Sequence, residues 1–280
     1  GVQTCALPIF HELSKEYNII PLTIESYADM DTPISVFMRM KTKSNCFLLE
    51  SIGQNQVTAR YSFIGRNPFI NFQSIGNQVT VTDYTGKTKT YTAEPMRELE
   101  KLIAKYKAPK LENVPSFNGG AVGFFSYDII RQYENLPNTP ENDLDIPDMH
   151  FLLTDEIIAF DHKTQKIITI VNIHADGNIE QQYKKASMRL LDIREEMADL
   201  SKLTQKEQRN YRDSAKIISN ISKEQFCANV EKAKEYIKNG DIFQVVLSQR
   251  FTVETSQKPF NVYRALRLIN PSPYMYYIDF

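Results

Sequence analysis

The amino-acid sequence predicts an α+β protein with mixed or antiparallel sheets. Short runs of β-branched and aromatic residues recur along the chain, and Pro, Gly, Asn or Ser bounds most of them, as is typical of strands. Some of these runs are joined by hairpin turns, and segments with helical periodicity lie between groups of strands. This grouping favours an α+β arrangement over a parallel, doubly wound sheet.

The strand signals are densest in the first 200 residues. Val79 and Val81 alternate with polar residues ahead of the turn 83–86, which predicts a hairpin with one solvated face. A second hairpin is predicted around the polar segment 161–166. The predicted strands are 19–24, 46–50, 61–65, 69–72, 87–91, 119–125, 156–160, 167–173, 242–253 and 276–280.

Besides the helical start after residue 9 and a helix capped at 126–128, four helices are predicted from apolar spacing and end signals. Pro95 occupies the first turn of the helix 94–106, and a long amphipathic helix spans 179–197. Ser222 and Gln225 form a capping box, and Gly240 ends that helix. The fourth predicted helix spans 261–269.

The chain divides into four predicted regions. Residues 1–9 do not fit the helical start that follows them, so we interpret them as a non-native leader. An amino-terminal region spans 10–200, a polar linker spans 201–221, and a second domain begins at 222 and stops inside a strand at 280. We therefore expect a fragment whose last sixty residues or so are poorly packed.

Composition excludes several classes of protein. The formal net charge is -1, so nothing indicates nucleic acid or an anionic membrane as the main partner. The apolar runs are too short to span a bilayer. The three cysteines lack metal-ligand spacing and favour reduced thiols in a cytoplasmic protein. The four histidines are scattered, so we assign them no role.

Three segments are the candidates for a functional site. The strand 46–50 ends in Glu50 and Ser51, an anionic acceptor and a hydroxyl that suit the ammonium group of an amino acid, although a solvated strand end has the same pattern. Gln244 shares one face of the predicted strand 242–253 with Ser248 and Arg250, which also fits a half-exposed strand. Two prolines stiffen the loop before Tyr274 and Met275, which suits a flat apolar ligand or an ordinary turn.

Together and in this order, the segments LLES, RYSFIG, GGAVGFFSYD, GDIFQVVLSQRF and NPSPYMYY resemble the large subunit, component I, of anthranilate synthase. The resemblance runs from about residue 19 to 280 and covers the amino-terminal region and the opening of a chorismate-binding catalytic domain. It implies two sheets packed face to face with helices outside. It also implies conversion of chorismate and ammonia to anthranilate and pyruvate, with Mg²⁺ as cofactor and a glutamine amidotransferase as partner.

The resemblance further implies feedback inhibition by L-tryptophan. Glu50 and Ser51 would meet the ammonium and carboxylate end of the ligand, and Arg60 is a further candidate for the carboxylate. Pro273, Tyr274 and Met275 would hold its other side, so that the site bridges two domains. The catalytic groups and Mg²⁺ ligands of the family are expected beyond Phe280, which implies an inactive fragment.

Two alternatives remain open. Gln244 stands where isochorismate and salicylate synthases carry a lysine that activates water, and a neutral amide is compatible with relatives that use ammonia. Those relatives include component I of aminodeoxychorismate synthase, although RYSFIG and NPSPYMYY are more similar to the anthranilate enzyme. A non-catalytic, tryptophan-binding regulatory module is the second alternative.

Overall fold

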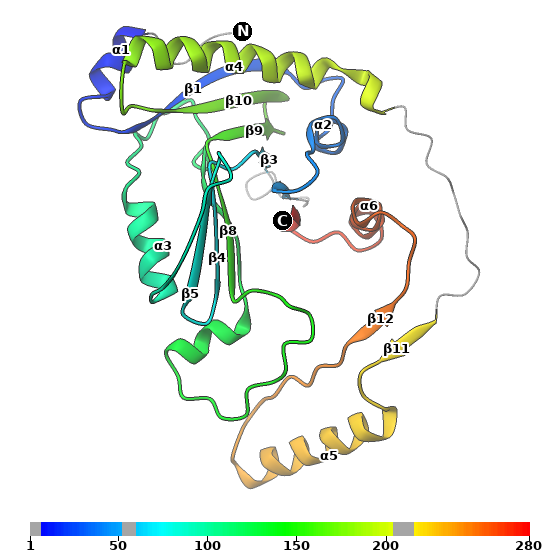
Figure 1. The fold of residues 1–280 in the computed structure, drawn as a ribbon. Helices are drawn as coiled ribbons and strands as arrows, with labels where there is room; N and C mark the ends of the chain where they lie inside the picture. The colour runs from blue at the N-terminus through cyan, green and yellow to red at the C-terminus, as the bar shows by residue number, and fades with distance from the viewer. Residues whose placement is uncertain (1–6, 52–59, 204–215) are drawn as a thin grey trace. The chain divides into compact units, whose positions relative to one another are not determined.

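The computed structural model describes residues 7–51, 60–203 and 216–280 (Figure 1). The chain forms two compact units: unit 1 contains residues 1–205 and 266–280, and unit 2 contains residues 206–265. Among the described residues, no helix has both the length and the apolar character needed to cross a membrane. The domain boundaries expected from the sequence stay a prediction.

Unit 1 contains a six-stranded sheet in which every neighbouring pair of strands is antiparallel. Its order is β1-β10-β9-β3-β2-β13, so the last strand of the chain pairs with an early one. The bounds are β1 (Ile19–Tyr27), β10 (Lys166–His174), β9 (Glu156–Asp161), β3 (Tyr61–Arg66), β2 (Cys46–Glu50) and β13 (Met275–Asp279).

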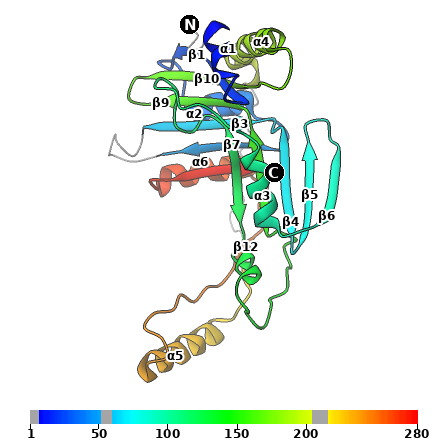
Figure 2. The ribbon, with the colours of Figure 1, turned by 90° about the vertical axis from the view of Figure 1, so that its left-hand side faces the viewer.

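A second, five-stranded antiparallel sheet completes the β structure of unit 1 (Figure 2). The chain passes between the sheets at residues 67–69 and again at Asp155, and Asn67 turns with a left-handed φ of 49°. The order is β6-β5-β4-β8-β7, with bounds β6 (Thr88–Thr92), β5 (Gln78–Asp83), β4 (Ile70–Ile75), β8 (Met149–Thr154) and β7 (Gly120–Phe125).

The two sheets share a hydrophobic core, which confirms the predicted α+β class with antiparallel sheets packed against each other. Two glycines permit close approach within it. A Cβ on Gly65 would lie 2.2 Å from the ring of Phe47, and one on Gly123 would lie 1.9 Å from the carbonyl oxygen of His150. The buried core residues are Phe47, Val114, Val122, Leu152, Ile157, Ala159, Ile168 and Ile170.

Helices cover the other face of the six-stranded sheet. In Figure 1, α4 (Ile179–Ala198) lies along β1 and β10, and it buries Ala186, Leu190, Ile193 and Met197. Asn178 caps its first turn by accepting a hydrogen bond from the amide of Gln181. The remaining helices of unit 1 are α1 (Leu7–Leu13), α2 (Pro33–Met40), α3 (Pro95–Ala104) and the short η1 (Tyr127–Gln132) and η2 (Leu200–Leu203).

Unit 2 holds α5 (Lys223–Asn239), β11 (Ile217–Ser219) and β12 (Phe251–Val253), and α6 (Pro259–Ile269) continues from it into unit 1. Ser222 caps α5, and Gly240 ends it with a left-handed φ of 81°, as the sequence predicts. The predicted strand 242–253 is wrong over most of its length, because only β12 is a strand. Residues 241–250 alternate suitably, but among the described residues no strand pairs with them.

The predictions from sequence omit the helix α2, the strands β8 and β11 and the short helix η2. The helix α2 begins at Pro33 after Thr32, which forms a capping box with Ser35, and β8 comes after the segment 135–147, which contains three prolines. The helix α1 begins at Leu7, inside the predicted leader 1–9, whose first six residues lie outside the described ones.

Candidate ligand site

Pairing of β2 with β13 brings together two of the segments that the sequence singled out. Met275 is the cross-strand partner of Glu50, although 225 positions separate them (275 minus 50). Directly opposite residues of antiparallel strands point to the same side, so both side chains lie on one face of the sheet. Glu50 and Met275 belong to unit 1 and are 3% and 7% exposed.

Glu50 is a buried carboxylate with a cationic partner. The Nε–H of Arg267 donates to both carboxylate oxygens, at 3.0 Å to Oε2 and 3.2 Å to Oε1. The side chain of Glu50 is 1% exposed, whereas that of Arg267 is 32% exposed. A buried carboxylate without a partner would carry a large desolvation cost, and the ion pair with Arg267 offsets part of that cost.

A hydroxyl and an imidazole lie near the other edge of β2, where this strand pairs with β3. Ser62 is the cross-strand partner of Glu50 on β3, and its Oγ lies 2.8 Å from Nε2 of His162. Burial lowers the pKa of His162, while the negative charges of Glu50 and Asp161 oppose that shift. We call Glu50, Ser62, His162 and Arg267 the Glu50 cluster, a group of polar side chains at one end of β2.

Arg60, the predicted alternative for a ligand carboxylate, is already engaged. Its Nη2 and Nε donate to the Asp161 carboxylate at 2.8 and 3.3 Å. Burial opposes ionisation of Asp161, but hydrogen bonds from Arg60 and the Lys163 amide hold its pKa below the ordinary value. Phe160 of β9 is the cross-strand partner of Ser62, and Asp161 is the next residue along β9. Because successive side chains of a strand alternate, Asp161 points to the face of the sheet opposite that of Ser62.

The other predicted site residues are more open. Pro273 and Tyr274 precede β13 and are exposed, Tyr274 by 75%, and Ser51 is half-buried directly after β2. All three belong to unit 1 with Glu50 and Met275. Gln244 is exposed in unit 2 outside any strand, so the predicted strand context of this residue is wrong, and its active-site role stays a prediction.

Three members of the Glu50 cluster are not predictable from the sequence. Ser62 lies in the RYSFIG segment, but its position opposite Glu50 depends on strand register. His162 is a scattered histidine to which the sequence assigns no role, and Arg267 lies within a predicted helix. Charged residues at helical spacing are usually solvated, so no local signal distinguishes Arg267 from Arg264 one turn earlier.

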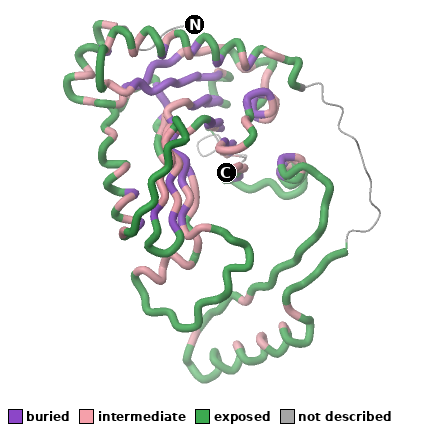
Figure 3. The backbone as a smooth tube through the Cα atoms, viewed as in Figure 1, coloured by how far each residue is buried: buried purple, intermediate pink, exposed green. Residues whose placement is uncertain are grey.

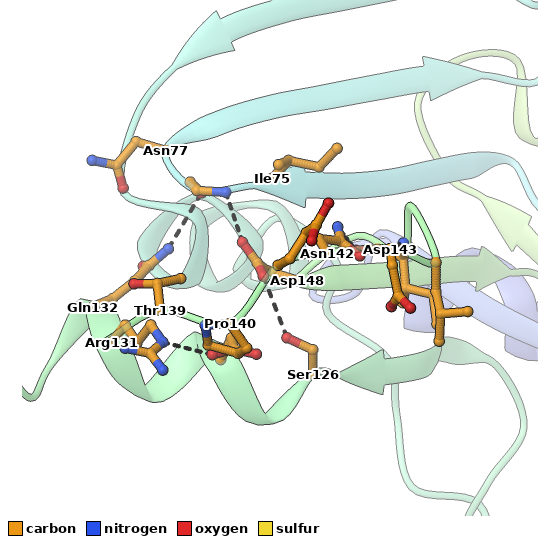
Figure 4. Close-up of a pocket in the computed structure, with 15 residues that line it drawn as sticks. Ile75, Asn77, Ser126, Arg131, Gln132, Thr139, Pro140, Asn142, Asp143 and Asp148 are labelled. Carbon is orange, nitrogen blue, oxygen red and sulfur yellow. Dashed lines mark hydrogen bonds and ion pairs between the residues drawn. The ribbon is translucent and has the colours of Figure 1, made fainter. Parts of the chain in front are cut away.

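A separate pocket of about 580 Å³ lies beside the five-stranded sheet (Figure 4). Asp148 holds its walls together by accepting hydrogen bonds from the Gly76 amide at 2.7 Å and the Ser126 hydroxyl at 3.4 Å. Arg131 pairs with Asp128 at 2.6 Å. None of the predicted site residues lines this pocket, so it is distinct from the Glu50 cluster.

The fold and the sequence together define the class of this protein. The family model described as chorismate binding enzyme matches residues 44–280, which is most of the chain. The chain therefore belongs to the chorismate-binding enzyme family.

Particular relatives are similar over nearly the whole chain. Anthranilate synthase component 1 of Acetivibrio thermocellus is 51% identical over 275 residues, covering 96% of this chain and 55% of the relative. That of Aquifex aeolicus is 36% identical, with the same two coverages. The crystal structure of anthranilate synthase component I from Streptococcus pneumoniae superposes with a TM-score of 0.59 at 29% identity, covering 88% of this chain and 52% of that one. The chain thus spans about half the length of these relatives.

Proposed function

We propose that this chain is the amino-terminal part of an anthranilate synthase large subunit. In the whole protein, chorismate and ammonia would be converted to anthranilate and pyruvate, the first step of tryptophan biosynthesis. The observation that carries this proposal is the 51% identity to the Acetivibrio thermocellus protein over 96% of the chain. The curated relatives described above all have the name anthranilate synthase component 1.

We assign the region around Glu50 and Met275 to an effector site for L-tryptophan. A buried carboxylate suits the ligand ammonium group, and the thioether of Met275 together with the exposed ring of Tyr274 suits an indole. Ser51 and Pro273 flank the same strand ends. Binding at this site would report the end product of the pathway and inhibit the enzyme.

The remaining requirements of the reaction belong to parts outside the described residues. Among these residues, no group of three or more His, Cys, Asp or Glu side chains is placed to hold a metal ion. By resemblance to the family, Mg²⁺ would be held by carboxylates that follow Phe280 in the whole protein, where it would bind the substrate carboxylate. A glutamine amidotransferase would supply ammonia, and the cytoplasm is the expected location.

Aminodeoxychorismate synthase component I is the competing enzyme, and Gln244 suits both because each uses ammonia. The names of the relatives favour the anthranilate enzyme. A regulatory module without catalysis would keep the effector site and lack activity in every context. The activity of a chimera with the remaining part of a relative therefore distinguishes such a module from the enzyme.

The test is a chimera in which residues 1–280 are followed by the remaining carboxy-terminal part of the Acetivibrio thermocellus relative. With chorismate, ammonium and Mg²⁺, we expect anthranilate fluorescence from the chimera, inhibition of that signal by L-tryptophan, and no signal from the 280-residue chain alone. A chimera that folds but releases aminodeoxychorismate, or no product, would contradict the proposal. Activity of the 280-residue chain alone would contradict the placement of the catalytic groups.

A further inference from the structure

The ion pair between Arg267 and Glu50 has an asymmetric geometry. Glu50 is buried to 1% side-chain exposure, while the side chain of Arg267 reaches it from a position that is 32% exposed. Among the described residues, both hydrogen bonds of Arg267 are made by Nε. The two Nη groups, which form the fork of the guanidinium, are therefore not used in holding Glu50.

We propose that Arg267 is the residue that binds the α-carboxylate of the amino-acid effector. This inference rests on the effector site proposed above. The ammonium group would contact the Glu50 carboxylate, and the carboxylate would accept hydrogen bonds from the two Nη groups of the same Arg267. An arginine fork matches a carboxylate in a bidentate geometry, and the pre-formed ion pair places a negative and a positive group side by side, as a zwitterion requires.

The neighbouring basic groups are less suitable for this role. The guanidinium of Arg60 uses both Nε and Nη2 to hold Asp161, which points to the other side of the sheet. The His162 ring lies 2.8 Å from the Ser62 hydroxyl, and desolvation lowers its pKa, which favours the neutral ring, a weaker partner for a carboxylate than a guanidinium. Of these three groups, Arg267 donates hydrogen bonds to Glu50 and has a side chain that is 32% exposed.

In the proposed site, the acidic residue Glu50 lies deeper than the basic residue Arg267. Met275 is buried beside Glu50, and Tyr274 is exposed next to it. An amino acid bound by its ammonium group at Glu50 would place its side chain against Met275 and Tyr274 and its carboxylate toward the more open Arg267. We therefore expect selection for free α-amino acids over amines and over acids that lack the ammonium group.

The experiment is calorimetric titration of the 280-residue chain and its variants with three probes: L-tryptophan, tryptamine, which lacks the carboxylate, and indole-3-propionate, which lacks the ammonium group. Arg267→Gln is expected to weaken L-tryptophan binding about 10-fold or more and to leave tryptamine binding no weaker. Arg264→Gln, on the same helix one turn earlier, is the matched control and should change L-tryptophan affinity less than about twofold.

A second pair of variants covers the case in which Arg267→Gln does not fold because Glu50 is left buried without its partner. Glu50→Gln retains Arg267 and should bind indole-3-propionate, whereas Glu50→Gln combined with Arg267→Gln should lose that binding about 10-fold or more. Equal affinities within this pair, or unchanged L-tryptophan binding by Arg267→Gln, would overturn the role of Arg267 and leave the effector site intact. Failure of the unsubstituted chain to bind L-tryptophan would overturn the effector site itself, and the role of Arg267 with it.

Discussion

His150 is a half-buried histidine whose environment favours the neutral ring. It lies on β8, its Nε2 is 2.8 Å from Oδ1 of Asn71, and its ring stacks on Phe280 with centroids 3.9 Å apart. Burial lowers the pKa of His150 to about 4. A histidine in the unfolded chain has a pKa near ~6.5, so the unfolded state binds more protons between those two values.

Stability should therefore fall as the pH falls from about 6.5 toward 4, because protonation favours the unfolded chain. Between pH 7.5 and 5, His150 contributes at most about 2 kcal/mol of this loss. His150→Gln keeps a donor for Asn71 and removes the titration, so its free energy of unfolding in urea should depend less on pH over this range. The burial of His162 acts in the same direction and leaves a residual slope.

Replacement of the exposed His11 by Gln is the control and should leave the pH dependence unchanged. If His150→Gln and the unsubstituted chain lose the same free energy between pH 7.5 and 5, folding does not lower the pKa of His150.

Individual site residues were predictable to the extent that local pattern and family resemblance identify them. Glu50 and Met275 fall in segments that the sequence singled out, and the sheet places them opposite each other. Arg267 and His162 could not be identified in this way, since their relation to Glu50 arises from strand register and from a helix far along the chain. The role of a charged residue depends on the groups that it contacts in the folded chain, and the local sequence does not contain that information.

At the scale of elements, a chain of ion pairs fixes α4 to the six-stranded sheet. Arg189 of α4 holds Glu156 of β9 at 2.5 and 2.9 Å and also contacts Glu196 at 3.1 Å. Glu196 in turn pairs with Arg66 of β3 at 2.7 Å. Hydrogen bonding from Arg66, together with the charge of Arg189, holds the pKa of Glu196 below its ordinary value.

Glu196→Gln should destabilise the chain by about 3 kcal/mol, the low end of the cost of breaking a buried pair, because Arg66 would remain buried with its charge uncompensated. The side chain of Arg66 is only 9% exposed, whereas that of Glu196 is 31% exposed, which places the effect at that low end. Urea unfolding monitored by circular dichroism measures the change.

The adjacent Glu195 is exposed, so Glu195→Gln is a matched control for which we expect a change within about 0.5 kcal/mol. Equal stability of the two variants would mean that the ion pairs do not hold α4 in place.

Helices and strands were predictable where local sequence signals agree with tertiary strand pairing. The predictions were wrong where strand pairing alone determines whether a segment forms a strand. The helix ending at Gly240 and the hairpin of β9 and β10 follow from caps and alternation. Residues 241–250 have the alternation of a strand, yet a strand exists only when another strand supplies hydrogen bonds. The alternation over 242–253 therefore indicates a segment that can pair with another strand. Within it, only β12 forms a strand among the described residues, by pairing with β11.

At the scale of the whole molecule, burial is distributed unevenly (Figure 3). Unit 1 contains the shared core of the two sheets, whereas among the described residues of unit 2 only Phe260 and Tyr263 are buried. Phe243 is 93% exposed and Val246 is 81% exposed. The helix α5 buries none of its 17 residues, and most of the stability of helices in proteins comes from tertiary packing of an apolar face.

Hydrogen exchange should therefore separate the two units under native conditions. Local opening costs little free energy where few apolar contacts form, so amides of α5, β11 and β12 should exchange at the earliest labelling times. Amides of β9 and β10, which lie in the core of the six-stranded sheet, should remain protected and serve as the internal control in the same sample. Protection of α5 and β12 equal to that of β10 would contradict this expectation. In the chimera with the remaining half of the relative, protection appearing at 241–250 would mark the strand that the alternation of these residues predicts.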